Sequence, residues 1–297
     1  MPVAYVEPKE AALWRHSCPR GSRDDAGQAG RPSQAFAPVE WTIIIPFLNE
    51  REFICDTLRS VAAQQVPLNL ILVDNGSADR TGDLAAAECK RLGLNFALVH
   101  ESRAGKVQAL ATGLALVRTA FVATFDADTF YPSDYLSTAR SLLRKRDAVC
   151  AQAYYPKAAG GGWRRLCSGA KLLAFSWLLP HQAHNGGAGQ VFETGALRLA
   201  GGFDPRRWNF VLEDHEIVHR LGKLGSIECH WSFWCVPSRR HNDRPSKRWN
   251  FIERLLYHLT PARHSDWYFY RFLRPRLERR SLPGSAIGEQ IASAPVT

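Results

Sequence analysis

Two aspartates one residue apart, Asp126 and Asp128, directly follow an apolar run over residues 121–125 that has the pattern of a buried strand. Two carboxylates held this close repel each other unless a cation compensates. Carboxylate oxygens are the hard ligands that Mg²⁺ and Mn²⁺ prefer, and such an ion can bridge them to a substrate diphosphate. The alternative is that both aspartates only form a turn or cap the next helix. Their position behind a buried strand favours the metal.

Polar residues follow two earlier apolar runs as well. Residues 46–50 close the first run, and Asp74 ends the second, just ahead of Gly76. In an open parallel sheet, ligands bind at the carboxyl ends of the strands, near the point where the strand order reverses. We therefore expect these segments to converge with Asp126 and Asp128 on one crevice. Asp74 could instead be only a turn former.

Hydrophobic periodicity predicts the elements that position these residues. Apolar runs predict strands over 41–46, 69–74, 96–100, 121–125 and 148–154, and helical spacing predicts helices over 50–64, 81–92, 106–117 and 213–225. Asn49 is expected to cap the first helix and Gly93 to end the second. Buried strands that alternate with helices imply an α/β fold with a mostly parallel sheet covered on both faces.

Composition excludes several classes of protein. The chain has 297 residues, of which 45% are hydrophobic, so it can bury a large core. It contains no run of about 20 uncharged apolar residues, so we expect no membrane span. Its seven cysteines lack metal-ligand spacing and are interpreted as reduced core residues of a cytoplasmic protein. The net charge of +10 is uneven, because residues 238–280 hold twelve Lys and Arg against four Asp and Glu.

Six segments together resemble the motifs of the family 2 glycosyltransferases. They are TIIIPFLNE (42–50), LVDNGSADRT (72–81), GKVQALATG (105–113), FDAD (125–128), TGALRLAGGFD (194–204) and EDHEIVHRLGKLG (213–225). Each motif is weak alone, but they occur in the family's order over about 200 residues. The resemblance implies the GT-A fold, a single Rossmann-like sheet flanked by helices, with a loop-rich acceptor half and a C-terminal helical tail. It also implies an inverting enzyme that uses a nucleotide-sugar donor.

The resemblance extends to individual residues on the donor side. Seven positions match the family there: Pro46, Asn49, Glu50, Asp74, Lys106, Asp126 and Asp128. Among them, Asp74 would read the nucleotide base, Asp126 would face the ribose, and Asp128 would bind Mg²⁺ or Mn²⁺. Lys106 stands where relatives often keep a basic residue near the donor, although it could equally be a solvated lysine in the first turn of a helix.

On the acceptor side, Asp214 matches the family's catalytic base, with Glu213 beside it and with Thr194 and Gly195 nearby. Sugar transfer to a hydroxyl requires such a base whatever the family, because an acceptor hydroxyl is a poor nucleophile until a carboxylate takes its proton. Asp214 could instead serve only the dipole of its helix. Many relatives also have a histidine as a further metal ligand, for which His241 is the candidate here and His230, in a predicted strand, is the alternative. A lone histidine is more often structural.

We expect a UDP- or dTDP-linked hexose as donor and a glycan or lipid-linked acceptor. The segment PSKRW (245–249) retains only part of the QxxRW motif of processive members, which indicates transfer of a single sugar. The segment HNGGAGQ (184–190) is unusually Gly-rich for an acceptor wall, so the identity of the acceptor stays open. Two alternatives remain at this point: a retaining GT-A transferase, and a non-catalytic nucleotide-binding or membrane-associated scaffold with the same fold.

Residues 248–280 combine an apolar helical stripe with aromatic residues and arginines. One interpretation is a segment that lies on an anionic membrane, on its inner, cytoplasmic face, which would suit a lipid-linked acceptor. The alternative is a C-terminal helix that packs its stripe on the domain. We expect no nucleic-acid partner, because no recognised motif supports one.

The chain is accordingly divided into three parts. Residues 1–38 show no sustained hydrophobic period and are predicted to be a flexible leader. Residues 39–240 are predicted to form the GT-A domain, with a nucleotide-binding half over 39–130 and an acceptor half over 131–240. Residues 241–297 are predicted to be a basic, aromatic helical extension.

Overall fold

The structure is a computed structural model that describes residues 39–156, 187–238 and 250–280. The predicted leader over 1–38, the Gly-rich residues 184–186 and the candidate metal ligand His241 lie outside the described residues.

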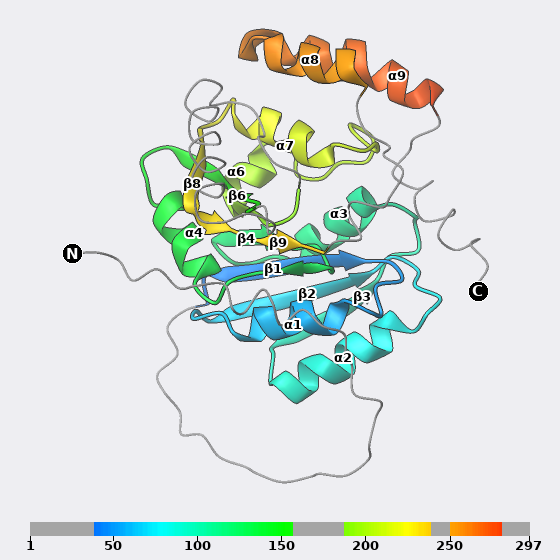
Figure 1. The fold of residues 1–297 in the computed structure, drawn as a ribbon, viewed down its shortest axis with the longest axis vertical. Coiled ribbons are helices and arrows are strands. Elements are labelled where there is room, and N and C mark those ends of the chain that lie inside the picture. The colour runs from blue at the N-terminus through cyan, green and yellow to red at the C-terminus, as the bar shows by residue number, and fades with distance from the viewer. Residues whose placement is uncertain (1–38, 157–186, 239–249, 281–297) are drawn as a thin grey trace.

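Within those ranges, a seven-stranded sheet forms the centre of the fold (Figure 1). Its strands are β1 (Trp41–Phe47), β2 (Leu68–Asp74), β3 (Phe96–His100), β4 (Phe121–Thr124), β6 (Ala148–Tyr154), β7 (Gln190–Glu193) and β8 (Ser226–Trp234), arranged in the order β3-β2-β1-β4-β7-β6-β8. Strands β1 to β4 are parallel, whereas β7 runs antiparallel to both of its neighbours. The strand order reverses between β1 and β4, which is where such sheets bind ligands.

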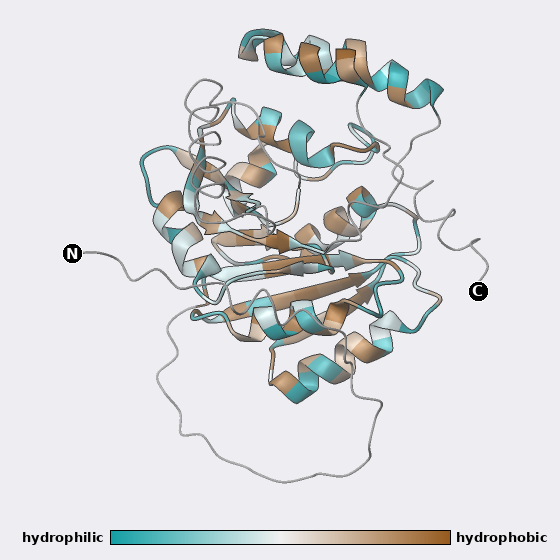
Figure 2. Ribbon diagram, viewed as in Figure 1, coloured by the Kyte–Doolittle hydropathy of each residue, from teal (hydrophilic) through white to brown (hydrophobic). Residues whose placement is uncertain are grey.

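Helices cover both faces of this sheet, as the sequence predicts. One face carries α1 (Ile54–Ala62), α2 (Thr81–Leu92) and α4 (Tyr135–Leu143), and the other carries α3 (Lys106–Leu116), α6 (Thr194–Leu199) and α7 (Glu213–Leu221). The hydropathy colouring shows brown, apolar strands between helices whose outward faces are largely teal (Figure 2). The predicted α/β class with a mostly parallel sheet is therefore confirmed.

Two helix boundaries differ from the prediction by four residues. Helix α1 begins at Ile54, and its N-cap is Phe53 without a side-chain cap, so the predicted cap at Asn49 is wrong. Residues 50–53 form a turn in which the amides of Phe53 and Ile54 both donate to the carbonyl of Glu50. Helix α7 ends at Leu221, four residues early, because the chain must turn there to enter β8.

A second, two-stranded sheet pairs β5 (Thr129–Phe130) with β9 (Val236–Pro237) in antiparallel register. Sequence periodicity does not reveal strands this short. The pairing brings Ser238 against Asp128, since Ser238 donates its backbone N–H to the Asp128 carbonyl at 2.8 Å. The loop that carries the paired aspartates is thereby attached to a segment more than 100 residues later.

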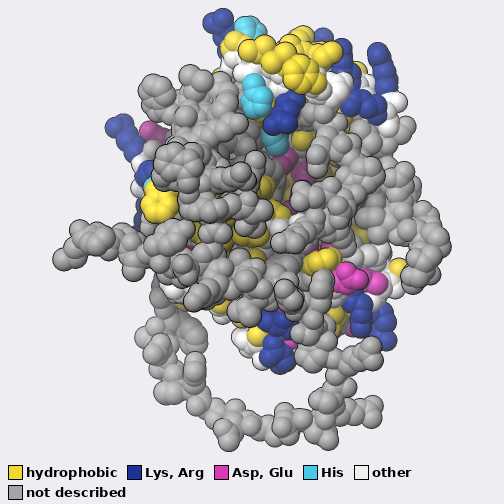
Figure 3. Space-filling model, viewed as in Figure 1, with side chains coloured by type: hydrophobic (Ala, Val, Ile, Leu, Met, Phe, Trp, Pro, Cys, Tyr) yellow, Lys and Arg dark blue, Asp and Glu magenta, His cyan; other side chains and the backbone are white. Residues whose placement is uncertain are grey.

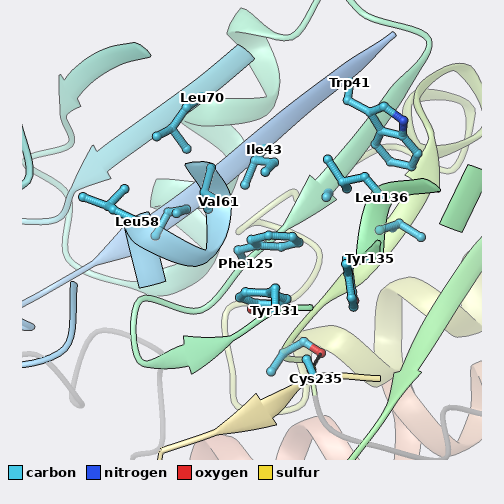
Figure 4. Close-up of a cluster of buried hydrophobic side chains, with 14 of the residues drawn as sticks. Trp41, Ile43, Leu58, Val61, Leu70, Phe125, Tyr131, Tyr135, Leu136 and Cys235 are labelled. Carbon is cyan, nitrogen blue, oxygen red and sulfur yellow. Dashed lines mark hydrogen bonds between the residues drawn. The ribbon is translucent and has the colours of Figure 1, made fainter. Parts of the chain in front are cut away.

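Aromatic side chains form the support beneath that loop (Figure 4). The rings of Phe125 and Tyr131 stack with their centroids 3.5 Å apart, and Tyr135 meets Phe125 edge-on at 5.3 Å. All three are fully buried, and the backbone N–H of Asp126 donates to the Tyr131 hydroxyl at 2.9 Å. The hydrophobic core therefore fixes the backbone from which Asp126 and Asp128 project.

The C-terminal residues form α8 (Phe251–Leu259), the short helices η3 (Ala262–His264) and η4 (Trp267–Leu273), and α9 (Arg274–Arg279). A separate apolar cluster joins this segment to the chain before α7, and it contains Trp208, Tyr257, Tyr268, Phe269, Leu273 and Leu277. The Glu216–Arg220 ion pair is buried beside it, and the Tyr270 hydroxyl donates to Glu216. The described part of the predicted extension thus packs against α7.

All five described cysteines are free, and four of them are buried, in agreement with reduced core residues. Among the helices that the structure describes, none combines the length and the apolar composition that a membrane crossing needs.

The loop that leads from β3 into α3 is held by one acidic residue, Glu101, which is only 6% exposed. Its carboxylate accepts hydrogen bonds from the backbone N–H and the guanidinium of Arg103 and from the Thr112 hydroxyl. The hydrogen bonds from Arg103 outweigh the effect of burial and lower the pKa of Glu101 to about 2. Glu101 thereby fixes the residues directly before Lys106.

We predict that Glu101→Gln lowers the free energy of unfolding by roughly 1–3 kcal/mol at pH 7, measured by urea denaturation. Since the pKa of Glu101 falls from 4.5 to about 2 on folding, its contribution is fully present above pH 4.5 and is lost as the pH falls towards 2. The difference in the free energy of unfolding between wild type and variant should shrink as the pH falls from 4.5 towards 2. A difference that stays constant from pH 7 to pH 3 would contradict this account, and Asp83→Asn on α2 is the matched exposed control.

Candidate active site

The loops after β1 and β2 are joined by direct hydrogen bonds. The backbone N–H of Asn49 donates to Ser77 Oγ at 3.1 Å, and Asn49 Oδ1 accepts from the N–H of Ala78 at 2.8 Å. The N–H of Glu50 donates to Thr81 Oγ1 at 3.1 Å. Asn49 makes these contacts with φ at 54°, a left-handed conformation that asparagine tolerates better than most residues. These loops therefore form one connected wall, with Pro46 paired to Val73 in the strands beneath it.

Asp74 ends β2 on this same wall. Its Oδ1 accepts from the N–H of Ser77 at 2.8 Å, and a Cβ on Gly82 would lie 2.8 Å from its Oδ2, so a larger residue there would displace the Asp74 carboxylate. No hydrogen bond or ion pair joins Asp74 to Asp126 or Asp128 within the described part of the chain. The structure thus places Asp74 at the end of a strand that is separated from β4 by β1 alone.

Lys106 links two carboxylates that are far apart in the sequence. Its Nζ lies 2.8 Å from Asp126 Oδ1 and 3.4 Å from Glu213 Oε1, so α3, the end of β4 and the start of α7 meet at one ammonium group. Enclosure by the protein disfavours the charged amine, but the charges of Asp126 and Glu213 outweigh it and raise the pKa of Lys106 above its usual range. Lys106, whose side chain is 39% exposed, is therefore a permanent cation that is held between two carboxylates.

Asn75 positions the loop before Lys106, a role that no sequence pattern predicts. The Asn75 side-chain amide donates to the carbonyls of Glu101 and Arg103 and accepts from the N–H of Gly105 at 2.7 Å. The end of β2 thereby determines where α3 begins, and with it the position of the Lys106 ammonium.

Glu213 and Asp214 open α7 and have pKa values shifted in opposite directions. Burial, reinforced by the charge of Asp214, raises the pKa of Glu213. Burial also opposes ionisation of Asp214, but the charge and hydrogen bond of His215 outweigh it and lower the pKa of Asp214. Asp214 Oδ1 lies 2.9 Å from both the backbone N and the Nδ1 of His215. Neighbouring carboxyl groups whose environments separate their pKa values are a common feature of acid–base sites.

The start of α7 adopts an unusual backbone conformation. Leu212, directly before Glu213, has φ at 72°, in the left-handed region that costs a leucine about 1–2 kcal/mol. Its carbonyl accepts the N–H groups of His215 and Glu216, and its side chain packs on the cluster that contains Trp208. Such strain persists only where the surrounding structure enforces it, and it occurs often at functional sites.

Two residues near the end of the Gly-rich segment contact Asp214. Gln190 donates its side-chain amide to the Asp214 carbonyl at 3.2 Å. Gly187 lies so close that an added Cβ would stand 2.8 Å from Asp214 Cβ and 3.1 Å from its Oδ2. The sequence showed only that this segment is rich in glycine, whereas the contacts of Gly187 and Gln190 with Asp214 follow from the fold.

Asp128 is held by the segment after β9. Its Oδ2 accepts from the Ser238 hydroxyl at 2.7 Å, and its Oδ1 has no hydrogen bond to a described residue. On the other side of the loop, the Thr57 hydroxyl donates to the Ala127 carbonyl at 2.8 Å. Asp128 therefore has one carboxylate oxygen fixed and the other available.

The carboxylates of this loop fit a divalent cation that is shared with a ligand. The described ranges contain no group of three or more His, Cys, Asp or Glu residues that would hold a metal by themselves. Mg²⁺, however, is usually bound through one or two carboxylates together with waters and substrate phosphates. Asp126 and Asp128 offer that donor set, and His241 lies outside the described residues.

Thr194 and Gly195 lie at the opposite edge of the sheet. Strand β7 runs antiparallel to β4, so that Gln190 pairs with Thr124 at the carboxyl end and Glu193 pairs with Phe121 at the amino end. Thr194 follows Glu193 and donates its N–H to Ala120. The structure therefore brings Lys106, Asp126, Glu213 and Asp214 together but leaves Thr194 and Gly195 a strand length away.

Residues 42–198, a little over half of the chain, match the model of glycosyl transferase family 2. The chain belongs to this family. The match spans the loops of β1, β2 and β4 and the start of α3, which hold most of the donor-side residues described above.

Two curated bacterial glycosyltransferases are similar to parts of this family member. The uncharacterized glycosyltransferase EpsJ of Bacillus subtilis is 30% identical over 99 residues, and glycosyltransferase GlyG of Streptococcus pneumoniae is 22% identical over 116 residues. The matched stretches cover 33% and 38% of this chain and 27% and 38% of the two relatives. The chain thus spans about a third of the length of these relatives.

Solved structures of other glycosyltransferases share the fold. The mannosyltransferase PcManGT of Pyrobaculum calidifontis, in complex with GDP-Man and Mn²⁺, has a TM-score of 0.57 at 20% identity, over 90% of this chain and 80% of its own. TarS 1–349 of S. aureus with UDP-GlcNAc has a TM-score of 0.52 at 18% identity, over 79% of this chain and 72% of its own. At such identities the likeness concerns the fold. Together with the family match, it shows that this member of family 2 has the GT-A fold.

We predict that Gly187→Ala reduces the turnover number at least about tenfold, because the new methyl group would displace the Asp214 side chain. Steady-state kinetics would measure this, with circular dichroism to verify the fold. Gly195→Ala is the matched control, since its new Cβ would lie 3.0 Å from the Glu193 carboxylate, at the opposite edge of the sheet, and should leave the turnover number unchanged. Equal turnover for both variants would contradict the contact assigned to Gly187.

Proposed function

We propose that this glycosyltransferase is a metal-dependent, inverting enzyme. It moves one sugar from a nucleoside-diphosphate hexose, with UDP or dTDP as the nucleotide, to a hydroxyl of a glycan or a lipid-linked acceptor. The observation that carries the proposal is a carboxylate, Asp214, with one oxygen held by His215, beside the Lys106–Asp126 ion pair. Action at the cytoplasmic side of the membrane remains a prediction from the sequence.

Asp214 is proposed as the base. His215 occupies Oδ1, which leaves Oδ2 to accept the proton of the acceptor hydroxyl. Because the pKa of Asp214 is lowered, the carboxylate is ionised at neutral pH and needs no prior deprotonation. The acceptor oxygen then attacks the anomeric carbon as its proton passes to Oδ2. Attack opposite to the leaving diphosphate would invert the anomeric configuration.

Lys106 and the paired aspartates are proposed to handle the diphosphate. Asp128 and His241 would hold a Mg²⁺ or Mn²⁺ ion, which when bound would offset the negative charge that develops on the leaving oxygens, while Asp126 would face the ribose. The Lys106 ammonium, 2.8 Å from Asp126, is close enough to contribute a second positive charge to the same phosphates. The donor set and the presence of Mn²⁺ and GDP-Man in the PcManGT structure support this assignment.

The loops after β1 and β2 are proposed to hold the nucleoside. Asp74 would accept hydrogen bonds from the base, and Pro46, Asn49 and Glu50 would form the wall beside it. The hydrogen bonds that Asn49 donates to Ser77 and accepts from Ala78 support this role, because they fix the shape of that wall before the donor arrives.

We predict that Asp214→Asn lowers the turnover number by about 10²–10⁴-fold while the affinity for the nucleotide stays within about threefold of wild type. The readouts are an enzyme-coupled assay of nucleoside-diphosphate release and isothermal titration with UDP. Asp83→Asn, an exposed carboxylate on α2, is the control and should leave turnover unchanged. If Asp214→Asn retains full turnover, the chain has another base, whereas a wild type that binds UDP without any turnover would be only a nucleotide-binding scaffold. The NMR-determined anomeric configuration of the product separates inversion from retention.

We further predict that UDP or a UDP-sugar raises the melting temperature only when Mn²⁺ or Mg²⁺ is present. A thermal-shift series with nucleotide alone, metal alone, both, and both with EDTA measures this dependence. Asp128→Asn should abolish the metal-dependent part, whereas Asp134→Asn, on the same side of the sheet but away from the paired aspartates, should retain it. Stabilisation that is unchanged by EDTA would overturn the metal assignment.

A further inference from the structure

Helix α8 turns its apolar face outward. Phe251, Ile252 and Leu259 are 80%, 63% and 66% exposed, whereas Glu253 and Tyr257 on the opposite side of the helix are buried. At 100° per residue, Phe251, Ile252, Leu255 and Leu259 fall on one continuous arc. The space-filling view shows a hydrophobic patch over α8 with Lys and Arg side chains around it (Figure 3). This is the reverse of a helix that buries its stripe on its own domain.

The outward face belongs to a firmly anchored helix. Asn250 and Glu253 form a reciprocal capping box at its start, and the Tyr268 hydroxyl donates to the Glu253 carbonyl at 2.9 Å. Tyr257 packs into the C-terminal apolar cluster. The exposure of the apolar arc is therefore a consequence of how the helix is held, since its buried side is fixed at several points.

A basic groove of about 600 Å³ opens next to this face. It is lined by Arg207, Arg220, Lys223, Asp266, Trp267, Tyr270 and Arg271. Asp266 is already bonded to Lys223 and His219, and Arg220 is paired with Glu216. Arg271 is exposed and forms no ion pair with a described residue. The groove therefore offers positive charge to an anionic group.

Trp267 connects the groove to the apolar face. It is 48% exposed and also lines an adjoining apolar groove of about 400 Å³, together with Leu256, Leu259 and Pro261. Tryptophan at the junction of apolar and charged surface is typical of segments that lie at a membrane interface. The apolar arc, Trp267 and the basic groove form one continuous surface, which we call the α8 surface.

We propose that the α8 surface docks on an anionic lipid bilayer. Phe251, Ile252, Leu255 and Leu259 enter the boundary between headgroups and acyl chains, and Trp267 lies at headgroup depth. Arg271, which forms no ion pair with a described residue, meets the lipid phosphates.

Charge favours a bilayer over a second copy of this chain as the occupant. Residues 250–280 hold seven arginines against the acidic residues Glu253, Asp266 and Glu278. Two copies joined through this surface would bring like charges together, whereas an anionic leaflet complements them.

Docking in this way would bring the proposed base close to the membrane. The Tyr257 ring, on the inner side of α8, lies 5.5 Å from the ring of His215, whose Nδ1 contacts Asp214. In the space-filling view, histidine and acidic side chains lie in a hollow beneath α8 (Figure 3). This step rests on the proposed function, and it narrows the acceptor to a lipid-linked one whose hydroxyl is presented at the bilayer surface.

The test is co-sedimentation of the full chain with vesicles of phosphatidylcholine alone and of phosphatidylcholine with about one third phosphatidylglycerol. Wild type should bind the anionic vesicles at least about tenfold more strongly, and about 0.5 M NaCl should weaken that binding. The double variant Phe251→Ser, Ile252→Ser should lose at least about tenfold in affinity, because both side chains leave the apolar phase. Arg271→Gln should lose severalfold.

Matched controls lie on other surfaces. Leu199→Ser removes an apolar side chain that is 82% exposed on α6, and Arg146→Gln removes a side chain that is 96% exposed after α4. Neither should change vesicle binding. Equal binding of wild type to both kinds of vesicle, or unchanged binding of the double variant, would overturn the proposal. So would a dimer in solution that the double variant dissociates, with no binding to vesicles, because the face would then join two copies of the chain.

The two proposals fail separately. Vesicle binding is measured without donor, so Asp214→Asn should bind vesicles like wild type whatever its turnover. Conversely, if wild type does not bind vesicles but still hydrolyses or transfers the donor sugar in solution, only the docking proposal is lost.

Discussion

The ammonium of Lys106 lies 2.8 Å from Asp126 and 3.4 Å from Glu213. It offsets the repulsion between these two carboxylates, which come from the end of β4 and the start of α7. Bringing buried like charges together without such a partner would neutralise one of them or separate the elements that carry them. Helix α3 must therefore be positioned so that the Lys106 ammonium reaches both carboxylates. Asn75 fixes its first residues, and Gly113 permits close packing, since a Cβ there would lie 2.5 Å from Ile44 Cγ2.

The sheet and the donor loops could be predicted because their signals are local. Apolar runs marked β1, β2, β3, β4 and β6 to within a residue or two, and the polar residues that end β1, β2 and β4 had to meet at one edge once these strands were parallel. The direction of β7 has no such signal. It is a four-residue strand whose pairing with β4 reverses the expected geometry, which is why Thr194 and Gly195 lie at the far edge.

Contacts within the site were beyond prediction for a different reason. Asparagine is a common helix-capping residue, yet the Asn49 side chain accepts a hydrogen bond from Ala78 in the neighbouring loop instead. His215 follows the acidic pair directly, but its hydrogen bond to Asp214 depends on the backbone of Leu212, which the C-terminal cluster supports. In the tail, periodicity revealed the stripe of α8 and could not say which way it faces. Each of these outcomes is decided by tertiary partners that are distant in the sequence.

The hydrogen bonds and ion pairs between α7 and the C-terminal helices limit how the sequence of this protein can change in evolution. Tyr270 completes the buried Glu216–Arg220 pair, and Asp266 binds His219 and Lys223 on the same helix. An exchange of the tail between homologues, or a shortened gene product that stops before it, would strip the helix that carries Asp214 of these partners. The tail and the helix should therefore be inherited as one unit, and new acceptor preferences should arise by substitutions within that unit rather than by recombination at its border.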